Sequence, residues 1–293
     1  MEKTRFSVDG VELVGDLHIA PGAAAKRPAV AIIGPMTYQK EQAPTQYARR
    51  LAALGFAALA YDSRYRGESG GAPRAWENPA HKVEDLKAAI AHLKTRDDVD
   101  AERVFVLAIC QGASEALRAV ADLGSETRGL ASIAGHYRDP EGDVEWLGAE
   151  GLAARKARGA AARAAFEATG EVACVKAVDQ TDMGVGMPGD FVWEWYQPWA
   201  DRGRWENLYP LMSDADLFEY ESISAARRLS TPWLMIHGEN CFLPSAARRH
   251  MAALPEATKT KTVWDATPHL AYYDRPATID RAVEEVAAWF KAA

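Results

Sequence analysis

The stretch VLAICQGA, residues 106–113, decides the fold, because it joins a buried strand to a helix through one sharp turn. The apolar run over 104–109 predicts a strand, and a helical pattern follows it. Such a turn exposes a nucleophile at the carboxyl edge of a sheet and requires small residues two positions on either side. Ala108 and Gly112 occupy those positions. We therefore predict that Cys110 is the nucleophile.

Two alternatives to this assignment exist. Cys110 could be an ordinary buried thiol, since free cysteines are among the most buried residues. Ser69 lies among glycines in GESGG, residues 67–71, but no helix begins there, so a turn is the better interpretation. At a helix N-terminus beside a protonated histidine, we expect Cys110 to have a depressed pKa.

The rest of the chain alternates short apolar runs with stretches of helical period. This alternation predicts an α/β fold in which helices cover both faces of a mostly parallel, eight-stranded sheet. The predicted strands are 4–7, 11–19, 29–33, 56–61, 104–109, 130–133, 233–237 and 259–264. The predicted helices are 45–53, 81–94, 113–122, 245–253 and 277–291.

Residues 136–230 interrupt this rhythm with an Ala/Arg-rich segment followed by a segment rich in aromatic residues, Met and Gly. We predict a cap insertion here, between the sixth and seventh strands, with residues 1–135 and 231–293 forming the core. The aromatic part either roofs a substrate pocket or packs on the core. The pocket candidates in it are Trp193, Trp195 and Tyr196.

His269 is the predicted general base. It lies between the last strand and the last long helix, and it follows the nucleophile in the chain order of this kind of site. His237 ends a strand, where a structural role is commoner, and His136 is a weaker rival.

The acid that would orient His269 is harder to assign. The usual His-Gly-x-x-Asp pattern reads HGENC at residues 237–241, so Cys241 stands where the aspartate is expected. Glu239 lies in the same loop and is the favoured candidate, because a carboxylate there would stabilise an imidazolium. Asp139, after the sixth strand, is the alternative acid. A Cys/His dyad without an acid is a third possibility, since a thiol needs less activation than a hydroxyl.

An oxyanion hole needs two backbone N–H groups aimed at the developing charge. Gln111 follows the nucleophile and supplies the first. In the loop after the third strand Pro35 has no N–H, so Met36 is the first good donor. Tyr38 could add its hydroxyl to this pocket or pack in the core.

These residues resemble bacterial α/β-hydrolases of the dienelactone-hydrolase-like kind, including the YcjY-type proteins. The resemblance covers most of the chain and rests on GPMTYQKE (34–41), YDSRYRGESGG (61–71), ICQG (109–112) and ATPHLAYYD (266–274). It implies the α/β-hydrolase fold, a Cys or Ser nucleophile at Cys110, a base at His269, no cofactor, and ester, lactone or thioester substrates.

The resemblance leaves three functions to weigh. The leading hypothesis is a hydrolase that forms a covalent acyl-enzyme on Cys110. The alternative is a biosynthetic enzyme that transfers, cyclises or eliminates a natural-product precursor, because the elbow and the acid position depart from the family pattern. The third is a non-catalytic binding protein with a degenerate triad.

Composition excludes other classes. The net charge of −7 argues against a nucleic-acid partner. No apolar run approaches the roughly 20 residues that span a bilayer, and we expect a soluble cytoplasmic protein. The three cysteines are far apart in sequence and form no CxxC pair, so neither disulfides nor a metal site is expected. The oligomeric state stays open, a homodimer included.

Overall fold

A computed structural model describes residues 1–22 and 26–293, and its centre is an eight-stranded sheet of order β1-β2-β4-β3-β5-β6-β11-β12. β1 pairs with β2 and β2 with β4 in antiparallel fashion, whereas the other pairs are parallel. The strands are β1 (Glu2–Val8), β2 (Val11–His18), β3 (Arg27–Ile33), β4 (Ala57–Tyr61), β5 (Val99–Ile109), β6 (Gly129–Ile133), β11 (Trp233–Gly238) and β12 (Thr260–Asp265). The predicted sheet is confirmed, and the largest difference is that β5 begins five residues early.

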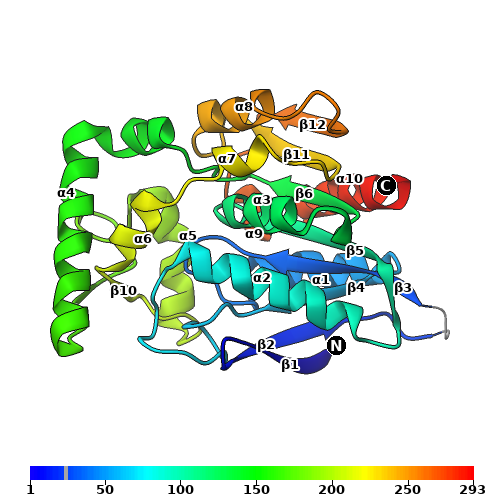
Figure 1. The fold of residues 1–293 in the computed structure, drawn as a ribbon, viewed down its shortest axis with the longest axis horizontal. Coiled ribbons are helices and arrows are strands. Elements are labelled where there is room, and N and C mark those ends of the chain that lie inside the picture. The colour runs from blue at the N-terminus through cyan, green and yellow to red at the C-terminus, as the bar shows by residue number, and fades with distance from the viewer. Residues whose placement is uncertain (23–25) are drawn as a thin grey trace.

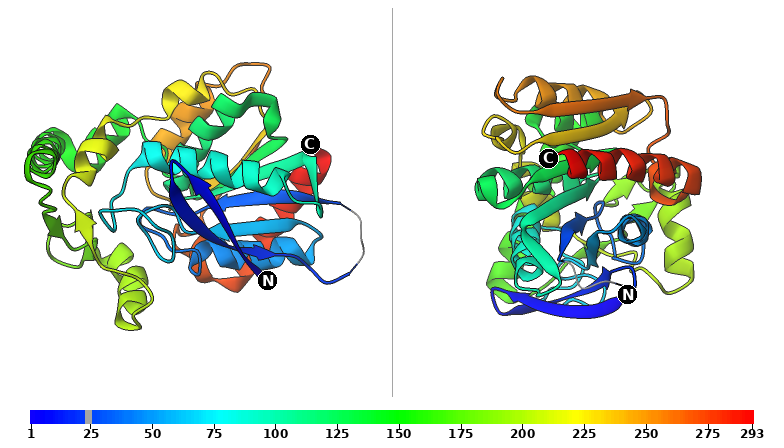
Figure 2. Two further views of the ribbon diagram at one scale, coloured as in Figure 1. Left: turned by 60° about the horizontal axis from the view of Figure 1, so that its bottom comes forward. Right: turned by 90° about the vertical axis from the view of Figure 1, so that its right-hand side faces the viewer.

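Helices cover both faces of this sheet (Figure 1 and Figure 2). One face carries α1 (Ala43–Ala53), α9 (Ala271–Asp274) and α10 (Pro276–Ala292). The other carries α2 (Pro79–Lys94), α3 (Gly112–Leu123) and α8 (Pro244–Ala252). In β3, Val30 and Ile32 pack into the first cluster, and Ala31 and Ile33 into the second. The central strands are therefore apolar along their length because both faces are buried.

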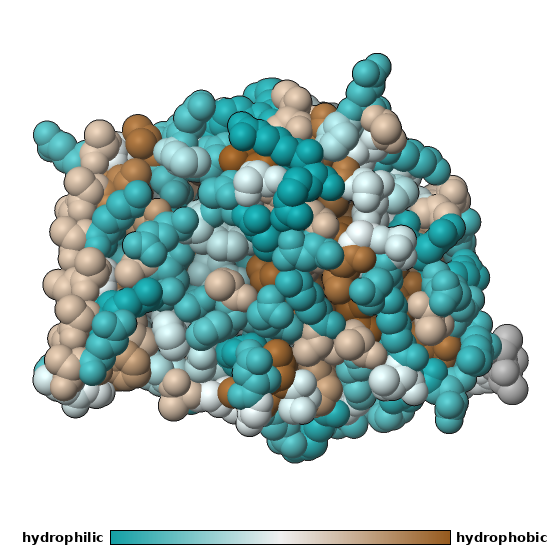
Figure 3. Space-filling view, in the orientation of Figure 1, coloured by the Kyte–Doolittle hydropathy of each residue, from teal (hydrophilic) through white to brown (hydrophobic). Residues whose placement is uncertain are grey.

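Between β6 and β11 the chain leaves the sheet and forms a separate group of elements on one side of it (Figure 1; Figure 2, left). They are α4 (Pro140–Thr169), β7 (Cys174–Val175), β8 (Val178–Asp179), β9 (Met187–Pro188), α5 (Asp190–Asp201), β10 (Tyr209–Pro210) and α6 (Ser213–Glu219). The last helix before β11, α7 (Ile223–Ala226), lies over the core against α3 and α8. We refer to residues 136–230 as the insertion. Gly148 breaks the helical geometry of α4, and the small residues of its exposed side form the pale brown left edge in Figure 3.

A buried carboxylate holds the insertion together. Asp214 accepts hydrogen bonds from Arg155 at 2.7 and 2.8 Å and from the Tyr209 hydroxyl at 2.7 Å. Arg155 also donates to the carbonyl oxygens of Val185 and Gly186. A buried ion pair costs desolvation, so it stabilises only where its remaining donors are also satisfied, as most are here. These bonds join α4, α6 and the loop before β9.

In the part of the chain that the structure describes, no helix is both long and apolar enough to span a bilayer.

The turn after β5 is strained at the predicted position. Cys110 has φ of +53°, a left-handed value that is uncommon for a residue with a side chain. Its N–H donates to Ile133 O at 3.1 Å, and its carbonyl accepts from Ala113 at 3.0 Å. Gly112 lies so close to β3 that a Cβ atom would stand 2.6 Å from Gly34 O. The sharp turn therefore depends on a residue without a side chain at position 112.

The substitution Gly112→Ala should destabilise the fold by about 1–3 kcal/mol, because the methyl group must displace backbone and not a flexible side chain. Urea unfolding followed by circular dichroism measures this change. Gly151→Ala in α4 is the control: its new methyl meets only ordinary contacts, so it should leave stability unchanged or raise it slightly. Equal stability of the two variants would contradict the close approach of Gly112 to the backbone of Gly34.

Candidate functional site

A cavity of about 60 Å³ lies between the carboxyl ends of the strands and the insertion, and Cys110 opens into it. Its walls are mostly apolar or aromatic, and no Arg, Lys, Asp or Glu is among the described residues that line it. The core supplies Met36, Cys110, Phe242, His269, Leu270 and Tyr273. The insertion supplies His136, Trp146, Met187, Pro188, Phe191, Val192 and Tyr196. The site is therefore small and uncharged.

Three polar groups near the Cys110 thiol favour its thiolate and so lower its pKa. They are the Tyr273 hydroxyl and the backbone N–H groups of Gln111 and Met36. Burial nevertheless outweighs them and raises the pKa of Cys110 to about 11. The expected depression of this pKa is wrong, because the sequence shows the helix N-terminus but not the desolvation. The backbone N–H groups of Met36 and Gln111 thus lie near the thiol, and their role as oxyanion donors stays a prediction.

His269 is reached from Cys110 only through Tyr273. His269 Nε2 lies 3.0 Å from the Tyr273 hydroxyl oxygen, and Nδ1 accepts a hydrogen bond from the Phe242 N–H at 3.2 Å. Because Nδ1 accepts, the neutral ring carries its proton on Nε2 and donates it to Tyr273. The Tyr273 hydroxyl is then free to donate to the sulfur. The chain of donors runs from His269 toward Cys110.

Burial and the nearby His237 lower the pKa of His269 to about 3. The expected imidazolium beside the thiol is therefore absent at neutral pH. His237 itself is fully buried and its Nε2 lies 3.0 Å from Gly135 O, which agrees with a structural role.

Tyr273 is the site residue that the sequence analysis missed. It follows His269 by four residues and lies in α9, where Tyr273 N donates to Leu270 O at 3.0 Å. Its ring packs edge-on against Trp195, with centroids 5.0 Å apart. The spacing was a usable signal, because residues four apart share one face of a helical turn.

Neither predicted acid contacts His269. Glu239 is exposed and hydrogen-bonds to Arg248 and, at 3.0 Å, to the indole of Trp264. Asp139 caps α4 through the N–H of Gly142 at 2.6 Å and pairs with Arg249 at 2.8 Å. In this structure Glu239 does not orient His269, and neither does the alternative Asp139. Each carboxylate pairs with an arginine instead: Glu239 with Arg248, and Asp139 with Arg249.

Cys241 takes the place of the usual aspartate. Its thiol is buried, lies 3.9 Å from Thr267 O and has a pKa raised by burial to about 12. Among the described residues, no carboxylate hydrogen-bonds to His269. The arrangement agrees with the third possibility, a site without an acid.

The loop that carries Met36 is held from several directions. Met36 O accepts from the Tyr196 hydroxyl at 2.8 Å, and Thr37 O accepts from the Trp205 indole at 2.7 Å. The Thr37 N–H donates to Glu77 at 3.2 Å. Such a loop presents the Met36 N–H in a fixed direction, as a preorganised oxyanion hole requires.

The predicted pocket residues divide in two groups. Tyr196 lines the cavity, whereas Trp195 supports it from behind Tyr273 and Trp193 packs against the core. Tyr38 is fully buried, and its hydroxyl lies 3.0 Å from that of Ser63, so it is a core residue outside the lining.

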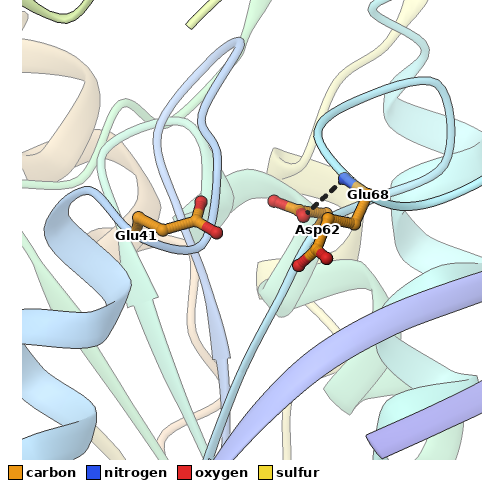
Figure 4. A group of neighbouring side chains, drawn as sticks. All are labelled: Glu41, Asp62 and Glu68. Atoms are coloured by element: carbon orange, nitrogen blue, oxygen red, sulfur yellow. Dashed lines mark hydrogen bonds between the residues drawn. The ribbon is translucent and has the colours of Figure 1, made fainter. Parts of the chain in front are cut away.

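Three carboxylates near the same loop, Glu41, Asp62 and Glu68, have oxygens close enough to hold a cation (Figure 4). The Lys40 ammonium already occupies their centre, at 2.7, 2.9 and 2.6 Å from the three groups. Asp62 also accepts from the Lys40 N–H at 2.8 Å. The cluster is an ion-pair network that joins the Met36 loop to the end of β4.

The different surroundings of the three free cysteines predict an order of alkylation. Desolvation raises the pKa of all three thiols, but of the three only Cys174 is exposed to solvent. Because only the thiolate reacts, iodoacetamide at pH 7–8 should label Cys174 first. The rate at Cys110 should then rise about tenfold per pH unit toward pH 11, as the thiolate fraction grows. Peptide mass spectrometry measures both, and fast labelling of Cys110 at pH 7 would contradict its burial.

Comparisons with known proteins agree with this architecture. A family model described as serine aminopeptidase, S33, matches residues 40–169. The chain is 40% identical over 113 residues to an uncharacterised protein, PA2218, of Pseudomonas aeruginosa. This aligned segment covers 38% of this chain and 30% of that protein. A solved structure of PA2218 superposes with a TM-score of 0.83 at 24% identity, over 99% of this chain and 92% of that one.

Two fungal proteins are also similar. Thiohydrolase apmlB of Arthrinium phaeospermum is 36% identical over 119 residues, which is 40% of this chain and 38% of that protein. Polyketide transferase claH of Penicillium crustosum is 33% identical over 134 residues, 45% of this chain and 43% of that protein. The matched segments thus span less than half the length of each of these curated relatives. The sheet order, the turn at Cys110 and these comparisons together show that the chain has the α/β-hydrolase fold.

Proposed function

We propose that the protein takes an acyl group from a thioester onto Cys110 and passes it to a second nucleophile. The observation that carries this proposal is the state of His269, whose Nδ1 accepts a backbone N–H where a carboxylate usually binds. Among residues 1–22 and 26–293, His269 therefore has no carboxylate partner that would stabilise its cation. The reaction that suits this site is one that needs little acid catalysis.

The choice of thioesters follows from the leaving group. When the Cys110 sulfur attacks, the tetrahedral intermediate expels the less basic of its two leaving groups. A carrier thiol has a pKa of about 8.5, close to that of an ordinary cysteine, so its thiolate can leave in competition with the Cys110 thiolate. An alkoxide is nearly as basic as hydroxide, whose parent water has a pKa of about 15.7, so an ester intermediate returns to reactants.

The acylation step balances without a cofactor. The new bond joins the Cys110 sulfur to the acyl carbon, the carrier C–S bond breaks, and the thiol proton of Cys110 ends on the departing carrier thiolate. In this proposal the N–H groups of Met36 and Gln111, which lie near the thiol, bind the carbonyl oxygen as it becomes negative. The Tyr273 hydroxyl supports the sulfur as it gains charge.

The fate of the acyl-enzyme depends on the acceptor. Water needs a base near neutral pKa, and His269, with a pKa of about 3, is a poor one. A thiol, an amine or a nucleophile within the acyl chain is more reactive and needs less help. We therefore expect transfer or cyclisation of the acyl group to be faster than its hydrolysis by water.

The names of two relatives support the proposal that the substrate is a thioester. One is a thiohydrolase and the other a polyketide transferase. The motifs that resemble the dienelactone-hydrolase-like group support the same covalent route at Cys110. A binding protein with a degenerate site accounts less well for the Tyr273 hydroxyl and the two backbone N–H groups near the Cys110 thiol.

A matched pair of substrates tests the proposal. Hexanoyl N-acetylcysteamine and its oxygen ester differ only at the leaving atom, and the thioester should acylate Cys110 at least about a hundredfold faster. Intact-protein mass spectrometry after rapid quenching measures the adduct. The acyl-enzyme should persist in buffer and disappear when a millimolar thiol is added, with the new thioester as product.

Cys110→Ser and Cys174→Ser are the paired controls. The first should abolish the adduct, and the second should leave it unchanged because Cys174 is exposed and distant from the cavity lining. Equal rates with the ester and the thioester, or an adduct on a cysteine other than Cys110, would overturn the proposal.

Tyr273→Phe should slow acylation by about tenfold to a hundredfold, because it removes a hydrogen bond to a group that becomes charged. It should also shift iodoacetamide labelling of Cys110 to higher pH, which a loss of packing alone would not do. Glu239→Gln is the matched comparison, and its acylation rate should stay within about twofold of the wild type, because Glu239 faces Arg248 and solvent. A large loss of acylation rate in Glu239→Gln would instead indicate that the Glu239 carboxylate takes part in the reaction.

A further inference from the structure

His136 is a polar side chain of the cavity wall with an unpaired ring nitrogen, Nε2, among the described residues. Tyr196 already donates to Met36 O, and both ring nitrogens of His269 are engaged. Tyr273 lies between His269 and Cys110. The His136 Nε2 is buried and has no partner among the described residues.

The position of His136 is fixed beside the nucleophile. Its backbone N–H donates to Cys110 O at 2.8 Å, which ties the end of β6 to the turn after β5. Its ring stands edge to face against Trp146 and Phe242, with centroids 5.9 and 4.8 Å away. The side chain is thus held in one orientation, only 4% exposed, in the wall that also contains Cys110.

The ring of His136 is uncharged in this setting. Burial, with Arg138 and His269 nearby, holds its pKa well below the usual range. A neutral imidazole has one donor and one acceptor, and so it pairs with a hydroxyl or a ketone oxygen. A charged substrate group would find no cation or anion among the described lining residues.

We propose that His136 recognises an uncharged oxygen substituent, a hydroxyl or a ketone, on the acyl chain that Cys110 carries. This inference rests on the proposed function and narrows its substrate to oxygenated acyl groups. Leaving a buried polar atom unpaired costs about 1–3 kcal/mol, and a substrate oxygen would recover part of that. A plain alkyl chain would leave His136 unpaired, so the site discriminates against it.

The competing explanation is that His136 only fills space between two aromatic rings. An edge-to-face imidazole gains some stability from such packing without any ligand. The two explanations differ in one measurable respect. A packing residue affects all acyl chains of one length alike, whereas a recognition residue affects the ratio between oxygenated and plain chains.

The test compares hexanoyl N-acetylcysteamine with its 3-hydroxy, 3-oxo and 5-hydroxy derivatives. The rate of Cys110 acylation is measured by quenched intact mass spectrometry. In the wild type at least one oxygenated chain should react about tenfold or more faster than hexanoyl, which is the effect of one hydrogen bond. In His136→Phe this preference should fall to within about twofold, whatever the change in the hexanoyl rate itself.

Two further variants make the result decisive. Phe242→Leu alters the same wall without removing a polar group, so it should change all the rates together and keep the ratio. His136→Gln keeps a donor and an acceptor and should retain part of the preference. If His136→Phe does not fold, which circular dichroism detects, the wild-type ratios and His136→Gln still decide.

Equal rates for all four chains in the wild type would overturn the role of His136, as would a preference that survives in His136→Phe. Such results would leave the proposed acyl transfer intact, because Cys110 is acylated in each case. Failure of every thioester to acylate Cys110 is a different outcome, and it would overturn the proposed function together with this inference.

Discussion

The hydrogen bond from the Phe242 backbone N–H to His269 Nδ1 sets the protonation of the whole site. A backbone N–H cannot give up its proton, so the neutral imidazole must keep its own proton on Nε2. That proton points to Tyr273, and the Tyr273 hydroxyl in turn points to the sulfur. A carboxylate at the same place would accept from Nδ1–H and reverse every donor in this chain. One backbone contact thus separates a site that receives a proton from one that donates hydrogen bonds toward its nucleophile.

The absence of charged side chains among the described lining residues affects both the resting protonation states of the site and its interaction with a developing negative charge. Desolvation keeps Cys110 a thiol and His269 a neutral base, which makes the resting enzyme unreactive. The same low polarity strengthens the N–H groups of Met36 and Gln111 toward an oxyanion, because no water competes with them. The Lys40 network and the Tyr196 and Trp205 bonds hold that loop in place. The site therefore stabilises charge that develops during the reaction better than charge that exists before it.

The sequence was sufficient for the fold and for the sharp turn at Cys110, because both depend on local patterns. Apolar runs mark strands buried on both faces, and the small residues around Cys110 mark the turn. The acid could not be predicted in this way. Glu239 lies in the right loop, but its side chain turns outward to Arg248 and Trp264, and both partners come from other segments. The pKa of Cys110 depends on the insertion that closes over it, which no local pattern reveals. Tyr273 acquires its role only because α9 brings it between two residues far apart in sequence.

The cysteine at position 110 and the cysteine at position 241 are best understood together. A serine hydroxyl needs a base strengthened by a carboxylate, because an alkoxide is too costly to form otherwise. With Cys241 in place of that carboxylate, His269 cannot serve a serine well. A thiol tolerates the weaker base, but its acyl-enzyme then also lacks a base to activate water. The loss of the acid therefore favours both a sulfur nucleophile at acylation and an acceptor other than water at deacylation, and thioester-to-acceptor transfer satisfies both conditions.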